Sequence, residues 1–80
     1  MAERLAVIRN PGYGARDFPG VVGLFFDVKM SESSGALICL FDEDAEAVLK
    51  HVYSVERLDK MVCWVEVVGN LVKFKRLANL

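Results

Sequence analysis

The stretch that decides the fold is MVCWVEVVGNLVKFKRL, residues 61–77. It contains two runs of alternating apolar residues, separated by Gly69-Asn70. Gly followed by Asn is typical of a two-residue type II′ turn, because the first turn position needs a positive φ, which glycine adopts without strain. The stretch therefore predicts a β-hairpin in which Val68 lies opposite Leu71 and Glu66 lies opposite Lys73.

The two faces of this predicted hairpin differ in chemistry, because side chains alternate between faces along each strand. One face is apolar, and we assign it to the core: Cys63, Val65, Val67, Val72 and Phe74. The other face is mixed and carries Trp64, Glu66, Lys73 and Lys75 together with Val62, Val68, Leu71 and Leu77. In this register Trp64 lies opposite Lys75.

The mixed face has two interpretations. As a solvated face, it would pair Glu66 with Lys73 and lay the Lys75 stem on the Trp64 ring, contributing about 1 kcal/mol together. As a docking surface, it would use Trp64 as an anchor, since tryptophan is enriched at the energetic centres of interfaces.

Length and composition predict one small domain over residues 1–80 that binds rather than catalyses. Of the 80 residues, 54% are hydrophobic, and the mean hydropathy is +0.30. A domain of this size buries only about 60% of the surface of its unfolded chain. Surplus apolar residues in so short a chain favour a homo-oligomer, such as a homo-dimer, or a partner interface.

The charge balance excludes general electrostatic binding to nucleic acid or to anionic membranes. Ten basic and eleven acidic residues give a net charge of −1. The charges cluster locally, with acids at residues 42–46 and cations at Lys73, Lys75 and Arg76. The first residues lack the apolar core of a signal peptide, and no apolar run approaches the ~20 residues of a membrane helix, so we expect a cytoplasmic protein.

The chemistry-bearing residues predict neither catalysis nor metal binding. Cys39 and Cys63 lie in apolar strand patterns and are expected to be buried free thiols. With the single His51 they do not form a zinc pattern. No Ser-His-Asp or Cys-His set and no phosphate-binding loop is recognisable, so we expect no cofactor and no enzymatic activity.

The upstream segments predict three more strands and a long loop. Residues 4–9 form an apolar run that ends at Asn10-Pro11-Gly12, and we expect this strand in the sheet interior. Residues 10–20 hold both prolines and form the expected loop. Residues 21–30 alternate as a strand. Residues 36–41 are continuously apolar, which is typical of a central strand covered on both faces.

A helix is predicted after the third strand. Asp42 is a suitable N-cap, and apolar residues recur at helical spacing at Ala45, Val48, Leu49 and Val52. Residues 54–60 suggest a loose turn before the hairpin. The resulting order, with one helix between the third and fourth of five antiparallel strands, defines a small α+β domain. It fits both an OB-like small barrel and an open sheet covered by one helix.

The segment that most resembles a binding site is Gly12-Tyr13-Gly14-Ala15-Arg16-Asp17. Two glycines allow the backbone to turn tightly or to approach a ligand, Tyr13 offers a stacking face, and Arg16 offers a fork for phosphate or carboxylate. Alternatively, Arg16 and Asp17 tie the loop to the sheet while Tyr13 covers an edge. Both interpretations stay open.

Four short motifs resemble a set of small, uncharacterised accessory proteins encoded by tailed phages and prophages. They are Gly12-Tyr13-Gly14-x-Arg16-Asp17, Ser33-Ser34-Gly35-Ala36-Leu37, the block from Leu58 to Cys63-Trp64-Val65-Glu66, and Val72-Lys73-Phe74-Lys75-Arg76. Such proteins often have Gly at the position of Lys60. The resemblance implies an accessory role in a bacterial host, in which the protein binds and blocks a defence or regulatory component stoichiometrically.

Three functional hypotheses follow. The favoured one is a phage-type binding protein that inhibits a host protein or protein complex, for example as an anti-CRISPR. The second is a single-stranded nucleic-acid-binding module, with Trp64, Phe25 or Tyr13 stacking on bases and cations meeting phosphates. The third is a sponge for a nucleotide messenger that uses Tyr13 and Arg16. The candidate binding residues are Tyr13, Arg16, Asp17, Trp64, Lys73 and Lys75.

Overall fold

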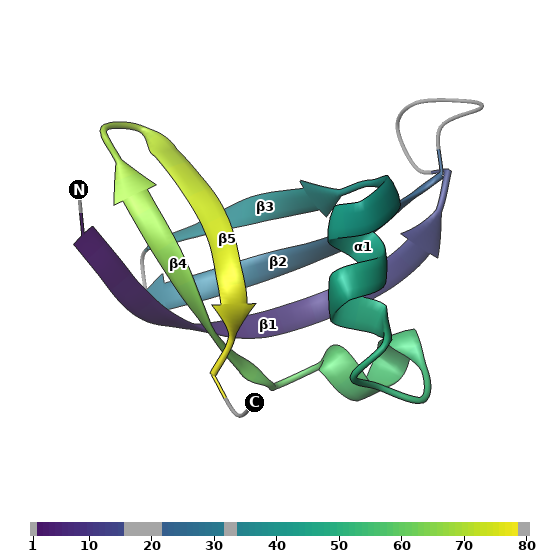
Figure 1. Cartoon of the computed structure of the whole chain (residues 1–80). Coiled ribbons are helices and arrows are strands. Elements are labelled where there is room, and N and C mark those ends of the chain that lie inside the picture. The colour runs from purple at the N-terminus through teal and green to yellow at the C-terminus, as the bar shows by residue number, and fades with distance from the viewer. Residues whose placement is uncertain (1, 16–21, 32–33, 79–80) are drawn as a thin grey trace.

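The computed structural model describes residues 2–15, 22–31 and 34–78 (Figure 1). The elements in chain order are β1 (Ala2–Gly14), β2 (Gly23–Ser31), β3 (Ser34–Leu40), α1 (Asp42–Leu49), the 3-10 helix η1 (Val55–Leu58), β4 (Val62–Val68) and β5 (Leu71–Leu77). The predicted α+β fold with five strands and a helix between the third and fourth is confirmed. Neither helix among these residues has the length and apolar character needed to cross a bilayer.

All five strands form one antiparallel sheet in the order β3-β2-β1-β4-β5. The long strand β1 is central, as predicted, and it changes neighbours at Val7: residues 2–7 pair with β4, and residues 7–14 pair with β2. The sheet therefore curls, and β5 crosses in front of β2 and β3 (Figure 1). The edge strands β3 and β5 contact each other, so the sheet is a half-barrel and the open-sheet alternative is wrong.

The core lies inside the curl and is closed by α1. Its buried members are Ala6, Ile8, Leu24, Phe26, Val28, Ile38, Ala45, Val48, Leu58, Cys63, Val65 and Leu77. The rings of Phe26 on β2 and Phe74 on β5 meet edge to face with their centroids 5.6 Å apart. This contact joins the two halves of the curled sheet, because these strands are not neighbours in it.

The hairpin turn is where the sequence predicts it. Val68 pairs with Leu71, Glu66 with Lys73, and Val65 with Phe74. Gly69 has φ 59°, and Asn70 is not among the residues with positive φ, as a type II′ turn requires. The predicted core face of the hairpin is confirmed for Cys63 and Val65, which are fully buried, and for Val72 and Phe74, which pack against the core. Val67, on the same face near the turn, is only half-buried and does not belong to the core.

The predicted register of the hairpin is wrong near the end of β5, because this strand contains a bulge. Between Phe74 and Arg76 the pairing advances by two residues, while β4 advances by one. Trp64 therefore lies opposite Arg76 and not opposite Lys75. The extra residue reverses the alternation, so Leu77 pairs with Cys63 in the core and does not join the mixed face.

The predicted end of the first strand is also wrong. β1 continues through Asn10 and Pro11 to Gly14. A bulge separates the pairs Arg9–Asp27 and Gly12–Phe25, and Asn10 has φ 54°. A bulge accepts proline because it needs no ladder hydrogen bond at that position, and asparagine tolerates positive φ. The predicted loop over 10–20 therefore does not begin at residue 10, and Tyr13 belongs to a strand; residues 16–20 of that prediction lie outside the described residues.

The third correction concerns β3, which is an edge strand and not a central one. It pairs with β2 on one side, and no strand pairs with its other side within the described part of the chain. The Leu37 side chain is 46% exposed. The continuous apolar sequence thus does not reflect coverage on both faces within one copy of the chain.

The helix α1 and the turn that leads into β4 agree with the prediction in part. α1 packs Ala45 and Val48 into the core, as its spacing predicts. The expected N-cap is wrong, because Phe41 precedes the helix and no side chain caps its first turn. After η1, the Lys60 amide donates to the Ile8 carbonyl at 2.7 Å, which attaches this turn to β1.

Candidate functional site

The Trp64 patch lies on the outer face of β1 and β4, away from the core. We define it as Leu5, Val7, Val62 and Trp64. Leu5 pairs directly with Trp64, and Val7 pairs with Val62, so the four side chains form two adjacent cross-strand rows. Leu5 is 51% exposed, Val7 is also exposed, and the other two are half-buried. The predicted outward position of Trp64 is therefore confirmed.

Arg76 borders this patch on β5. Its guanidinium carbon lies 5.6 Å from the centre of the Trp64 ring, and its Nη1 lies 3.1 Å from a Glu3 carboxylate oxygen. The guanidinium is thus held by both a π face and a carboxylate. The sequence interpretation assigned this place to Lys75, because the bulge was not foreseen. The signal was available in the spacing of Phe74 and Leu77, two core residues three positions apart.

A charged row separates the patch from the hairpin turn. Glu3, Glu66 and Lys73 lie side by side across β1, β4 and β5. Lys73 is exposed opposite Glu66, as predicted, but no ion pair within 4.0 Å joins them; those found among the described residues are Arg76–Glu3 and Arg9–Asp59. Val68 and Leu71 lie beyond the row, so they are not continuous with the Trp64 patch.

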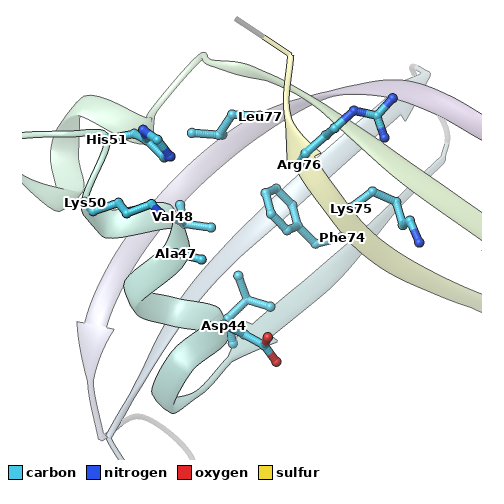
Figure 2. Close-up of a pocket in the computed structure, with 10 residues that line it drawn as sticks. Asp44, Ala47, Val48, Lys50, His51, Phe74, Lys75, Arg76 and Leu77 are labelled. Carbon is cyan, nitrogen blue, oxygen red and sulfur yellow. The ribbon is translucent and has the colours of Figure 1, made fainter. Parts of the chain in front are cut away.

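A groove lies between α1 and β5, and it contains the predicted residue Lys75 (Figure 2). Its volume is about 360 Å³. Figure 2 shows Phe74 pointing from β5 toward α1, near Val48, with His51 and Lys50 at one end of the groove. Lys75 lines this groove from the bulge, so the structure does not bring it together with Trp64 as predicted.

The remaining predicted residues lie elsewhere. Tyr13 is exposed near the end of β1, opposite Leu24, beside a hollow of about 280 Å³. That end of β1 lies across the molecule from the β4–β5 turn (Figure 1). Arg16 and Asp17 fall outside the described residues. The six candidate residues thus do not form one site among the parts that the structure describes.

The thiols and acids of the described residues do not gather into a cluster. Both cysteines are free; Cys63 is buried and Cys39 half-buried. Burial raises the pKa of the Cys63 thiol to about 11, which disfavours the reactive thiolate. Within residues 2–15, 22–31 and 34–78, no three His, Cys, Asp or Glu side chains gather as metal ligands would.

The surface best suited to a function is therefore the Trp64 patch, which can make non-covalent contacts. It combines an aromatic ring, exposed aliphatic side chains and a bordering arginine. Comparison with known proteins finds no match to a family model, to a curated protein or to a solved structure.

Proposed function

We propose that this protein is a non-enzymatic, phage-type accessory protein that binds a host protein stoichiometrically in the bacterial cytoplasm. The observation that supports the proposal is the Trp64 patch. Tryptophan and arginine are enriched at the centres of protein interfaces, and apolar side chains that a partner can cover supply the hydrophobic term. The resemblance to phage proteins suggests that the partner belongs to a host defence system, as for an anti-CRISPR.

The position of the patch favours binding over a simply solvated face. In an antiparallel sheet with one solvent-exposed face, the outward-facing residues are usually polar. Here the central strand β1 instead presents Leu5 and Val7 outward, and β4 presents Val62 and Trp64 beside them. A face that contacts only solvent would not need four adjacent apolar side chains in the middle of the sheet.

Contacts at the border of the patch are already present in the protein without a partner. Arg76 is in contact with Trp64 and with Glu3, so both ring and guanidinium already have partners in the free protein. Preorganised side chains lose less conformational entropy on association, which favours affinity. Such a surface suits an inhibitor that occupies its target one to one and blocks it sterically.

The test is affinity capture from a bacterial lysate with matched variants. We expect one host protein in about equimolar amount with the wild type. Leu5→Lys places a charge in the patch and should abolish capture. Leu71→Lys is the control, because Leu71 is 63% exposed and lies outside the patch. Thermal unfolding of each variant verifies that it is folded. Equal capture by both variants would contradict the proposal.

The nucleic-acid alternative is tested in parallel with a labelled single-stranded oligonucleotide at low and high salt. Although the sheet is curled, two carboxylates, Glu3 and Glu66, lie beside Lys73 and Arg76. This mixed charge is unsuited to phosphate, so we expect no binding even at low salt. Affinity that falls steeply with salt would favour the nucleic-acid function over the protein-binding one.

A further inference from the structure

The free edge of β3 carries no charge. The strand reads Ser34-Gly35-Ala36-Leu37-Ile38-Cys39-Leu40, and it is the outermost strand on its side of the sheet (Figure 1). Among the described residues, no backbone hydrogen bond joins it to anything on the side opposite β2. β5, the opposite edge of the curled sheet, contacts β3 without pairing with it, so this edge of β3 has no hydrogen-bonded strand within the described part of one copy.

The other edge of the sheet is protected. β5 carries Lys73, Lys75 and Arg76 and contains a bulge. Charged side chains and bulges are the usual features that prevent an edge strand from pairing with another chain. β3 has neither charges nor proline, and its register with β2 is regular from Lys29 to Leu24. The two edges therefore differ in their protection against pairing with another strand, and β3 is the unprotected one.

We propose that β3 pairs antiparallel with β3 of a second copy, across a two-fold axis at Leu37, to form one continuous ten-stranded sheet. In this register Leu37 faces the partner's Leu37, and Ala36 faces the partner's Ile38. Every opposed pair is uncharged, so no like charges meet and no lone charge is desolvated. Such a contact is isologous, since the same strand is used by both copies.

The second copy fits this edge better than other strands of the chain. Pairing β3 with β5 of another copy would set lysines against apolar side chains and would meet the bulge at Lys75. Asp27, the neighbour of Leu37 on β2, does not oppose the proposed pairing, because both copies of β3 lie between the two Asp27 residues of the dimer, which places them about 14 Å apart. The Trp64 patch lies on β1 and β4, so the dimer leaves it free, and this inference stands independently of the proposed function.

The first test measures the oligomeric state by sedimentation velocity over about a hundredfold range of concentration. We expect a monomer–dimer equilibrium for the wild type. Leu37→Lys sets two ammonium groups opposite each other and should raise the dissociation constant about tenfold or more. Leu71→Lys, the matched exposed leucine on the protected edge, should leave it unchanged. A wild type that stays monomeric throughout, or a dimer weakened equally by both variants, would overturn the inference.

The second test does not depend on how the lysine variant folds. Directly opposed residues of an antiparallel pair have Cα atoms about 4.5–5.5 Å apart, within the range a disulfide accepts. Leu37→Cys in a Cys39→Ser background should therefore give a disulfide-linked dimer under mild oxidation, while Leu71→Cys in the same background should not. Equal cross-linking of both, or none at Leu37→Cys, would refute the register. Capture of an extended peptide of another protein by β3, with no dimer, would show a different occupant.

Discussion

Arg76 lies over Trp64, with its guanidinium carbon 5.6 Å from the ring centre, because a bulge at Lys75 shifts the alternation of β5. Without the bulge, Lys75 would occupy this place and Arg76 would point to the core side. The same bulge buries Leu77 against Cys63. One extra residue thus completes both the border of the candidate surface and the core beneath it.

We expect Arg76→Ala to lower the free energy of unfolding by about 0.5–1 kcal/mol, since a partly exposed cation–π contact and an exposed ion pair are lost. Trp64 is the single tryptophan of the chain, so its fluorescence reports the site directly. Acrylamide should quench it more efficiently in the variant. Lys75→Ala is the control and should change neither quantity. Equal effects of the two substitutions would contradict the assignment of Arg76.

Lys60→Gly should stabilise the protein. Lys60 has φ 72°, a left-handed conformation that costs a residue with a side chain about 1–2 kcal/mol and costs glycine little. The amide that donates to the Ile8 carbonyl is retained. Part of this gain is offset, because glycine increases the conformational entropy of the unfolded chain. We therefore expect the free energy of unfolding, measured in urea, to rise by about 0.5–1 kcal/mol. Lys73→Gly, within β5, should instead destabilise.

Gly23→Ala should destabilise through a clash with Phe41. A Cβ at position 23 would lie 2.6 Å and 2.7 Å from two ring carbons of Phe41, which itself meets the Phe25 ring edge to face. We expect the free energy of unfolding, measured in urea, to fall by roughly 1–3 kcal/mol. Gly12→Ala is the control, since a Cβ there has no neighbour within 4 Å. In a Phe41→Ala background the penalty at Gly23 should shrink; an unchanged penalty would point to another cause.

Stability should fall at alkaline pH because of Cys63. Burial raises the pKa of its thiol from 9.0 to about 11, so the folded state keeps the proton longer than the unfolded state. This contribution is fully present below pH 9.0 and is lost as the pH rises toward about 11. The loss amounts to roughly 2–3 kcal/mol. The free energy of unfolding, measured in urea across this pH range, should fall more steeply with pH for the wild type than for Cys63→Ala. Parallel profiles for the two proteins would contradict it.

Local patterns in the sequence determined the elements and their order. Gly69-Asn70 predicts the turn because the first position needs a positive φ, and the alternation after it predicts which side of β4 faces the core. The spacing of Ala45 and Val48 likewise predicts the buried side of α1. Each of these features depends on residues a few positions apart, so the chain carries the information locally.

Only the tertiary structure decided the bulges, the curl and the edges. The bulges at Asn10-Pro11 and at Lys75 depend on what the neighbouring strand offers. β3 has the sequence of a central strand, yet the order β3-β2-β1-β4-β5 sets it at an edge. Alternation along one strand shows which side chains share a face, but the choice of neighbour is made by long-range packing. The position of Arg76 over Trp64 and the open edge at Leu37 therefore became visible only in three dimensions.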